Sequence, residues 1–449
     1  MTIRIGSGSA WWGDRISPAK ENADKGQLDY LCFETMAEAT ISAAQVRKRR
    51  DPIFPGYDTW LDDRMTAVLP GCIKNKTKII SNQGWINPNG AAERIVYWLR
   101  AMGVHGVKVA AINGSLITDD VLNLTDTILE TGERTQALKN RIVSAEVYQG
   151  AEPIVQALKN GAQIVVTGRI ADPSIFAAPM MFEYGWGMND FMRLGLANGI
   201  GHLMECGAQV TGGYFADPGF KDIPRPWDLG FPIAEVDNDG TAIITKLEGT
   251  GGVINAMTIK EQLLYEVHDP YNYITPDVVV DFSTTRIREV AENRVMVSGI
   301  SGKPRTPTLK VSIGCEEGFI GEDMFFYAGE GALQRAKLAE SILRERFKLV
   351  ELKAEELRID YLGLNAIHGD MTPEVDHEPY EVAVRVAART TTREEAMKIG
   401  REVDGMAVSG VGMTGKRVPH QDRTREIIGV WSSLIDRSKI SPSIKMFES

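Results

Sequence analysis

The first two hundred residues repeat one pattern: a short apolar run, a turn containing Gly or Asn, and a segment with helical spacing. A strand followed by a helix has this signature. Runs that are apolar throughout, without alternation, are typical of parallel strands covered by helices on both faces. The runs lie at residues 3–5, 28–33, 78–80, 107–112 and 164–166, and the clearest connecting helices at 91–102 and 152–160.

These runs predict an α/β fold, with an N-terminal, mostly parallel sheet that carries helices on both faces. The connecting helices are long enough for the crossovers that parallel strands need. A closed barrel requires eight strands, whereas five or six runs are found, so we expect an open sheet.

The sequence changes character after residue 213. A segment rich in Pro, Asp and Gly leads into two runs, 231–235 and 241–247, and Asn238-Asp239-Gly240 between them predicts a hairpin. Further on, strands with two helices on one face predict a smaller α+β sandwich. We therefore expect an α/β domain over residues 1–275 and an α+β domain over 276–449. The strands of the second, α+β domain are expected at 278–282, 294–298, 308–313, 324–328, 357–362 and 382–388, and the helices of that domain at 331–345 and 392–403.

Composition excludes several classes of protein. With 449 residues, 43% of them hydrophobic and 24% charged, the chain is globular and large enough for two domains. The net charge of -10 and the lack of long basic stretches argue against a nucleic-acid partner. No run reaches the roughly 18 apolar residues of a membrane span, and no secretory signal is visible, so we expect a cytoplasmic protein without membrane contact. The four cysteines are far apart, as expected of reduced thiols.

Ligands of open α/β sheets bind beyond the carboxyl ends of the strands, so the loops there are the candidate site. The first, residues 6–14, is rich in Gly, and its amides are suited to an anion; Gly8, Ser9 and Asp14 are its candidate substrate-binding residues. The third glycine falls two positions late for G-x-G-x-x-G, which disfavours a dinucleotide.

Two further loops carry polar side chains. In residues 81–89, Asn82 is placed to donate to a substrate oxygen, Asn87 is a second binding candidate, and Asn89 is expected to cap the next helix. In residues 167–174, Arg169 suits a substrate carboxylate, and Asp172 serves either as a base or as a helix cap.

A predicted helix at 194–206 carries the best acid/base pair. His202 and Glu205 are three residues apart and so share one face, where the carboxylate can set the tautomer of the imidazole. The alternative is a histidine with a structural role only. Thr211 and Tyr214, just beyond this helix, and Glu248 and Thr250, in a later Gly-rich turn, are further substrate-binding candidates; that turn either covers the pocket or acts as a hinge.

Metal and cofactor requirements stay open. The six histidines lie far apart without a His-x-x-x-His pattern, but a Mg²⁺ ion held by carboxylates would leave no such pattern. The sequence contains neither a P-loop nor a Gly-x-Ser-x-Gly elbow. The cofactor is therefore unknown, and the sequence is compatible both with a divalent cation and with a reaction that needs no cofactor.

Several segments together resemble the acyclic terpene utilisation (AtuA-like) family. The longest, ECGAQVTGGYFADPG, begins at Glu205 and ends at Gly219; the others are residues 5–14, 28–31, 82–88, 166–169, 231–235, 248–252 and 261–266. The resemblance covers nearly the whole chain. It implies a lyase or hydratase of a catabolic pathway, acting on a branched hydroxy acid or its CoA thioester. Longer relatives carry an extra small C-terminal domain that has no counterpart in this sequence. The resemblance therefore also implies an oligomer in which a separately encoded small subunit supplies that domain.

The leading hypothesis is a hydratase-type lyase. Its base is His202 or Asp172, its oxyanion site is formed by amides of the first loop with Asn82, and its anchor for a carboxylate or acyl-CoA is Arg169. A C–C lyase acting on a 3-hydroxyacyl-CoA would use the same groups. Two further hypotheses are a nucleotide- or CoA-dependent transferase and a non-catalytic binding or scaffold subunit.

Overall fold

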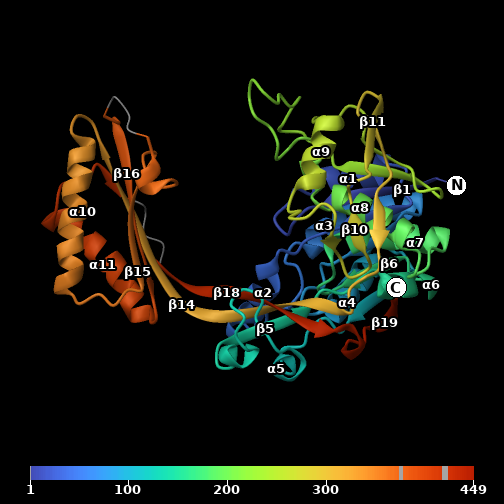
Figure 1. The fold of residues 1–449 in the computed structure, drawn as a ribbon, viewed down its shortest axis with the longest axis horizontal. Coiled ribbons are helices and arrows are strands. Elements are labelled where there is room, and N and C mark those ends of the chain that lie inside the picture. Colours follow the sequence, from blue (N-terminus) through green and yellow to red (C-terminus); the bar gives the residue numbers. More distant parts are fainter. Residues whose placement is uncertain (1, 374–377, 417–422) are drawn as a thin grey trace. The chain divides into compact units, whose positions relative to one another are not determined.

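The computed structural model describes residues 2–373, 378–416 and 423–449 and contains two compact units (Figure 1). Unit 1 comprises residues 1–314 and 430–449, and unit 2 comprises residues 315–429. The domain boundary expected near residue 275 falls inside unit 1, because the strands that follow it pair with strands of unit 1 or pack on its helices.

A ten-stranded open sheet forms the centre of unit 1, which confirms the predicted sheet type. Its five middle strands are parallel, in the order β1-β2-β3-β6-β4, and antiparallel strands extend it at both sides. The five parallel strands match the five apolar runs. Their bounds are β1 (Thr2–Ser9), β2 (Tyr30–Phe33), β3 (Lys78–Ser81), β6 (Ile164–Thr167) and β4 (Lys108–Asn113); the flanking strands are β7 (Pro232–Asp237), β8 (Ala242–Lys246), β12 (Arg294–Ser298), β11 (Arg286–Ala291) and β19 (Ser443–Glu448).

Helices cover both faces of this sheet. On β2, Tyr30 and Cys32 join one apolar core, and Leu31 and Phe33 join the other, as the two-residue period of a strand requires. The first core includes α6 (Glu152–Lys159), α7 (Asp172–Tyr184), α8 (Phe191–Glu205) and α9 (Ala256–Leu264); the second includes α1 (Ser17–Lys25), α3 (Leu61–Asn75) and α4 (Pro88–Ala101).

The strand order reverses between β3 and β6. The chain passes from β3 to β4, at the far side of β6, and then returns to β6 through β5 (Ile142–Val147) and α6. Ligands of open α/β sheets bind at the carboxyl ends of strands beside such a reversal. The loops after β2, β3 and β6 are therefore the place to look for a site.

The remaining parts of unit 1 complete its surface. The predicted hairpin is confirmed by the antiparallel pairing of β7 with β8. A small sheet packs against α8, and it consists of β9 (Tyr273–Ile274), β10 (Val279–Asp281) and β13 (Ser301–Lys303). Helices α2 (Glu38–Arg50) and α5 (Val121–Leu124) follow β2 and β4. In the described part of the chain, no helix combines the length and the apolar character that crossing a bilayer demands.

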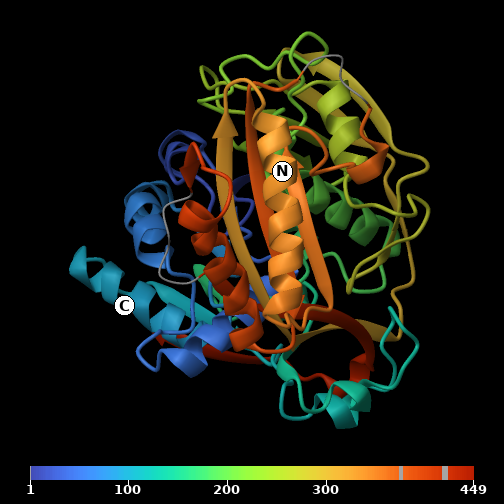
Figure 2. The same cartoon turned by 90° about the vertical axis from the view of Figure 1, so that its left-hand side faces the viewer.

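Unit 2 has the predicted α+β architecture, with two helices on one face of an antiparallel sheet (Figure 2). The order β15-β16-β14-β17 and the succession of elements correspond to a β-α-β-β-α-β motif. The strands expected at 308–313 and 324–328 are one strand, because the glycines between them do not interrupt it. The elements are β14 (Thr308–Ala328), which starts in unit 1, α10 (Ala332–Leu349), β15 (Glu356–Leu362), β16 (Glu381–Thr390), α11 (Arg393–Ser409), β17 (Gly415–Lys416) and β18 (Thr424–Asp436), which ends in unit 1.

Candidate functional site

Buried side chains link the ends of β1, β2 and β3. Ser9 Oγ donates to the Glu34 carbonyl at 2.6 Å. Asn82 donates from Nδ2 to Glu34 Oε1 at 2.9 Å, and its Oδ1 accepts from the amide and hydroxyl of Thr35. Burial raises the pKa of Glu34 well above its usual value, and the charge of Asp172 adds to this rise. The Asn82 amide, expected to face a substrate oxygen, thus orients Glu34.

Arg169, in the loop after β6, is buried, with 1% of its surface exposed. Its Nη1 donates to the Met36 carbonyl at 3.0 Å and lies 3.6 Å from Asp172 Oδ1. Its Nη2 lies 4.0 Å from Glu38 Oε1, and the guanidinium stacks on Tyr148 at 4.1 Å from the ring centroid. Protein groups therefore already surround the guanidinium that we expected to bind a substrate carboxylate.

Asp172 opens helix α7 and is partly accessible. Its side chain keeps 30% of its surface exposed, yet Oδ1 is enclosed and has no hydrogen-bond partner among the described residues. Burial raises the pKa of Asp172 to about 6; Arg169 opposes this rise, and the charge of Glu38 adds to it. The helix cap is Ala171, so the capping role predicted for Asp172 is not seen. A carboxyl group with this pKa changes its charge close to neutral pH.

His202 and Glu205 form the predicted pair on α8, with 2.8 Å between Nδ1 and Oε1. Burial lowers the pKa of His202 to about 4, so the imidazole is neutral at pH 7. Burial raises the pKa of Glu205 well above its usual value, and the charges of Asp172 and Glu266 raise it further. The remaining atoms, His202 Nε2 and Glu205 Oε2, have no hydrogen-bond partner in the described part of the chain.

A glycine brings α8 close to the first turn of α7. A Cβ at Gly201 would lie 2.3 Å from the Pro173 carbonyl oxygen, much closer than such atoms can approach. Because Pro173 follows Asp172 and Gly201 precedes His202, this contact sets the distance between the acids on the two helices. The close packing of α7 and α8 therefore requires a glycine, which has no side chain, at position 201.

We expect Gly201→Ala to destabilise the protein by about 1–3 kcal/mol, the usual effect of overpacking. Thermal unfolding of the full chain, followed by circular dichroism, measures this effect. Gly187→Ala is the matched control, because a Cβ there would meet no described atom within 4 Å. Equal melting temperatures for the two variants would contradict the close contact.

Glu146, on β5, is a second buried acid beside Arg169. It is 1% exposed, and Oε2 has no hydrogen-bond partner among the residues that the structure describes. Burial raises its pKa to about 8, although Arg169 acts in the opposite direction. A glutamate in an unfolded chain titrates near 4.3. Between about pH 4.3 and 8 the folded chain thus holds a proton that the unfolded chain has lost, and stability falls as the pH rises.

Glu146→Gln is expected to remove this loss of stability. One pKa unit corresponds to about 1.4 kcal/mol, so the variant should be more stable than the wild type by a few kcal/mol at about pH 8.5 and similar to it at about pH 4.5. Melting temperatures at the two pH values test this, with the exposed Glu93→Gln as control. If Glu146→Gln and the wild type lost stability in parallel, Glu146 would have an ordinary pKa.

The segment after β1 differs from the predicted binding loop. β1 continues to Ser9, so Gly8 lies within the strand, where a Cβ would meet the Phe33 ring at 2.6 Å. Asp14 closes the following turn by accepting from the Ala10 amide at 2.9 Å and the Arg15 amide at 2.7 Å. Gly8 and Asp14 therefore have structural contacts that account for them.

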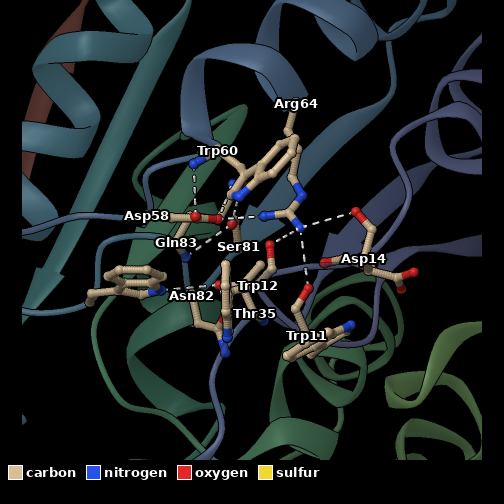
Figure 3. A network of polar contacts seen from close by, with 12 residues as sticks. Trp11, Trp12, Asp14, Thr35, Asp58, Trp60, Arg64, Ser81, Asn82 and Gln83 are labelled. Atoms are coloured by element: carbon tan, nitrogen blue, oxygen red, sulfur yellow. Dashed lines mark hydrogen bonds and ion pairs between the residues drawn. The ribbon is translucent and has the colours of Figure 1, made fainter. Parts of the chain in front are cut away.

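Arg64, on α3, holds this turn in place (Figure 3). Its Nη2 donates to the carbonyls of Trp12 at 2.6 Å and Trp11 at 3.2 Å, and its Nη1 pairs with Asp58. Both charged side chains are fully buried. Gln83, beyond β3, donates to Asp58 Oδ2 at 2.9 Å. The network thus connects the turn after β1 with the loop after β3.

Other predicted site residues make contacts within the protein. Asn87, rather than Asn89, is the cap of α4, accepting from the Gly90 amide at 3.0 Å. Thr211 donates to the carbonyls of Ala208 and Gly230. Tyr214 is 65% exposed and packs against the ring of Tyr265.

Glu248 and Thr250 lie in a different pocket. They line a cavity of about 600 Å³ near the ends of β8 and β12, whose lining includes neither Asp172 nor Glu205. Thr250 donates to the Leu247 carbonyl at 2.7 Å and accepts from Lys246. The structure thus brings Arg169, Asp172, His202 and Glu205 together, but not Glu248 and Thr250 with them.

No group of three or more His, Cys, Asp or Glu side chains within residues 2–373, 378–416 and 423–449 is arranged to hold a metal ion. The fold and these side chains define a mixed α/β protein with a buried, acid-rich site beside the carboxyl ends of its parallel strands. The chain belongs to the family described as acyclic terpene utilisation family protein AtuA, whose model matches residues 3–446. Comparison with curated proteins finds no match. The predicted family is therefore confirmed.

Proposed function

We propose that this protein is a hydratase-type lyase acting on a small branched hydroxy acid or its thioester. One observation carries the proposal: the carboxyl groups of Asp172 and Glu205 interact electrostatically, and burial raises the pKa values of both. Asp172 has a pKa of about 6, whereas burial and the charges of Asp172 and Glu266 hold the pKa of Glu205 well above its usual value. An acid and a base with such pKa values are what elimination of water requires.

In this proposal Asp172 is the base and Glu205 is the acid. Asp172 removes the proton from the carbon next to the carbonyl. The electron pair of that C–H bond passes to the carbonyl group and gives an enolate. The enolate then forms the double bond, the bond from the β-carbon to oxygen breaks, and Glu205 protonates the departing hydroxyl group to give water. Asp172 then carries the proton and Glu205 is ionised, so transfer of one proton through solvent restores the site. Addition of water follows the reverse course.

The neighbouring groups position and tune these two acids. Arg169 lowers the pKa of Asp172 and so favours its ionised form. The hydrogen bond between His202 Nδ1 and Glu205 Oε1 fixes the orientation of that carboxyl group. Because the His202 ring is buried and packs against Tyr273 and Phe282, we assign it a positioning role rather than that of the base.

Incubation of the purified protein in D₂O tests the proposal. The substrates are branched 3-hydroxy acids and their thioesters, and NMR detects deuterium at the α-carbon and the formation of the unsaturated product. We expect both for at least one substrate. If neither occurs with any of them, a binding or scaffold function would replace the proposed lyase.

A further inference from the structure

The charges around Arg169 bear on the substrate class. Five carboxyl groups interact electrostatically with this guanidinium, namely those of Glu34, Glu38, Glu146, Asp172 and Glu205. A second cation, Lys310, acts on Asp172 and Glu38; it is exposed and lies 4.9 Å from the Tyr148 ring centroid. Two of these carboxyl groups, those of Asp172 and Glu38, lie directly beside the Arg169 guanidinium.

A substrate carboxylate would be poorly stabilised here. The Arg169 nitrogens Nη1 and Nη2 face the Met36 carbonyl, Asp172 and Glu38, so a further anion would be buried without a counter-charge of its own. Burial of an unpaired charge is strongly unfavourable. Removal of an α-proton would add to the buried negative charge. The enolate of a carboxylate carries two negative charges, whereas the enolate of a thioester carries one.

Arg169 itself carries an unpaired donor for a neutral carbonyl oxygen. Arg169 Nε and Gln149 Nε2 are buried and lack hydrogen-bond partners among the described residues. The backbone carbonyl of Gln149 accepts from the Ala171 amide at 2.9 Å, and its Nε2 lies 3.5 Å from where a Cβ on Gly114, just after β4, would be. A carbonyl oxygen needs only such donors and brings no net charge into the site.

We infer that the site takes a thioester, whose reacting carbonyl is uncharged, and discriminates against the free carboxylate of the same acid. This inference rests on the proposed function, since it places the reacting carbonyl of the substrate beside Asp172 and Arg169. The free acid and the thioester are therefore not equivalent substrates.

A matched pair of ligands tests this: a branched 3-hydroxy acid and its N-acetylcysteamine thioester, which lacks the phosphates of CoA. Calorimetric titration of the full chain at pH 7.5 should give a Kd for the thioester at least tenfold lower than for the acid. Equal or tighter binding of the acid, or no binding of the thioester, would overturn the inference. Thioester binding without deuterium exchange would uphold the inference and reject the lyase.

The variant Glu38→Gln tests whether the surroundings of Arg169 cause the preference for the thioester over the free acid. Glu38 is 55% exposed at the start of α2, so we expect the variant to fold, and it removes one of the carboxylates that face the guanidinium. We expect this variant to bind the free acid more tightly, so that the Kd values of the acid and the thioester differ less than in the wild type. The control is Glu21→Gln, which removes a carboxylate of α1 that pairs with Lys25 and should leave both Kd values unchanged. If the ratio of the two Kd values in Glu38→Gln equalled that of the wild type, Arg169 and its carboxylate neighbours would not cause the discrimination against the free acid.

Discussion

Asp172→Asn is expected to slow α-proton exchange by about 10²- to 10⁴-fold, the usual contribution of a general base. Asparagine has nearly the same shape as aspartate but cannot accept the proton. The wild-type rate should rise with pH through about 6, as Asp172 loses its proton. The deuterium content of the substrate, measured by NMR at several pH values, gives both results.

Glu205→Gln distinguishes the acid from the base. This variant should retain α-exchange but lose formation of the unsaturated product, because glutamine cannot protonate the departing hydroxyl group. The control is Asp119→Asn, at an exposed position of unit 1, which should behave as the wild type. Exchange at the wild-type rate in Asp172→Asn would show that another group is the base.

Arg64→Met is expected to have the largest effect on stability, about 3–5 kcal/mol, because it leaves the fully buried Asp58 without its cation. The carbonyls of Trp11 and Trp12 would lose their donor as well (Figure 3). Thermal unfolding compares this variant with Arg94→Met, which removes a partly exposed pair with Asp62 and should cost about 1 kcal/mol or less.

The double variant Asp58→Asn/Arg64→Met separates charge from packing. It removes both charges, so it should be more stable than Arg64→Met alone. Additive effects of the two substitutions would contradict an ion pair that stabilises the turn after β1.

The parallel strands were predictable because helices bury both their faces, which leaves an unbroken apolar run at each strand. Strand β19 could not be predicted in this way, because it has no comparable apolar run and pairs with β4, which lies more than three hundred residues earlier in the chain. The length of β14 was also missed. Gly318, with a φ of +100°, and Gly321, whose missing Cβ admits the Ala396 carbonyl, suggest a break in sequence but lie within the continuous strand.

The candidate site was predictable where charged side chains directly follow strands, as Arg169 and Asp172 do, and where two share a helix face, as His202 and Glu205 do. Glu146 and Arg64 required the structure, since their partners are distant in sequence. One signal was available for Arg64: it lies on the apolar face of α3 with Leu61 and Val68, and a charged residue at such a position indicates a buried partner.

The proposed reaction requires that Asp172 and Glu205 carry opposite protonation states near neutral pH. Titration of ¹³C-carboxyl-labelled protein by NMR measures this directly, with Asp172→Asn and Glu205→Gln identifying the two resonances. We predict a pKa of about 6 for Asp172 and a pKa well above the usual value for Glu205. Midpoints near 4 for both groups, the ordinary values, would contradict the proposed reaction.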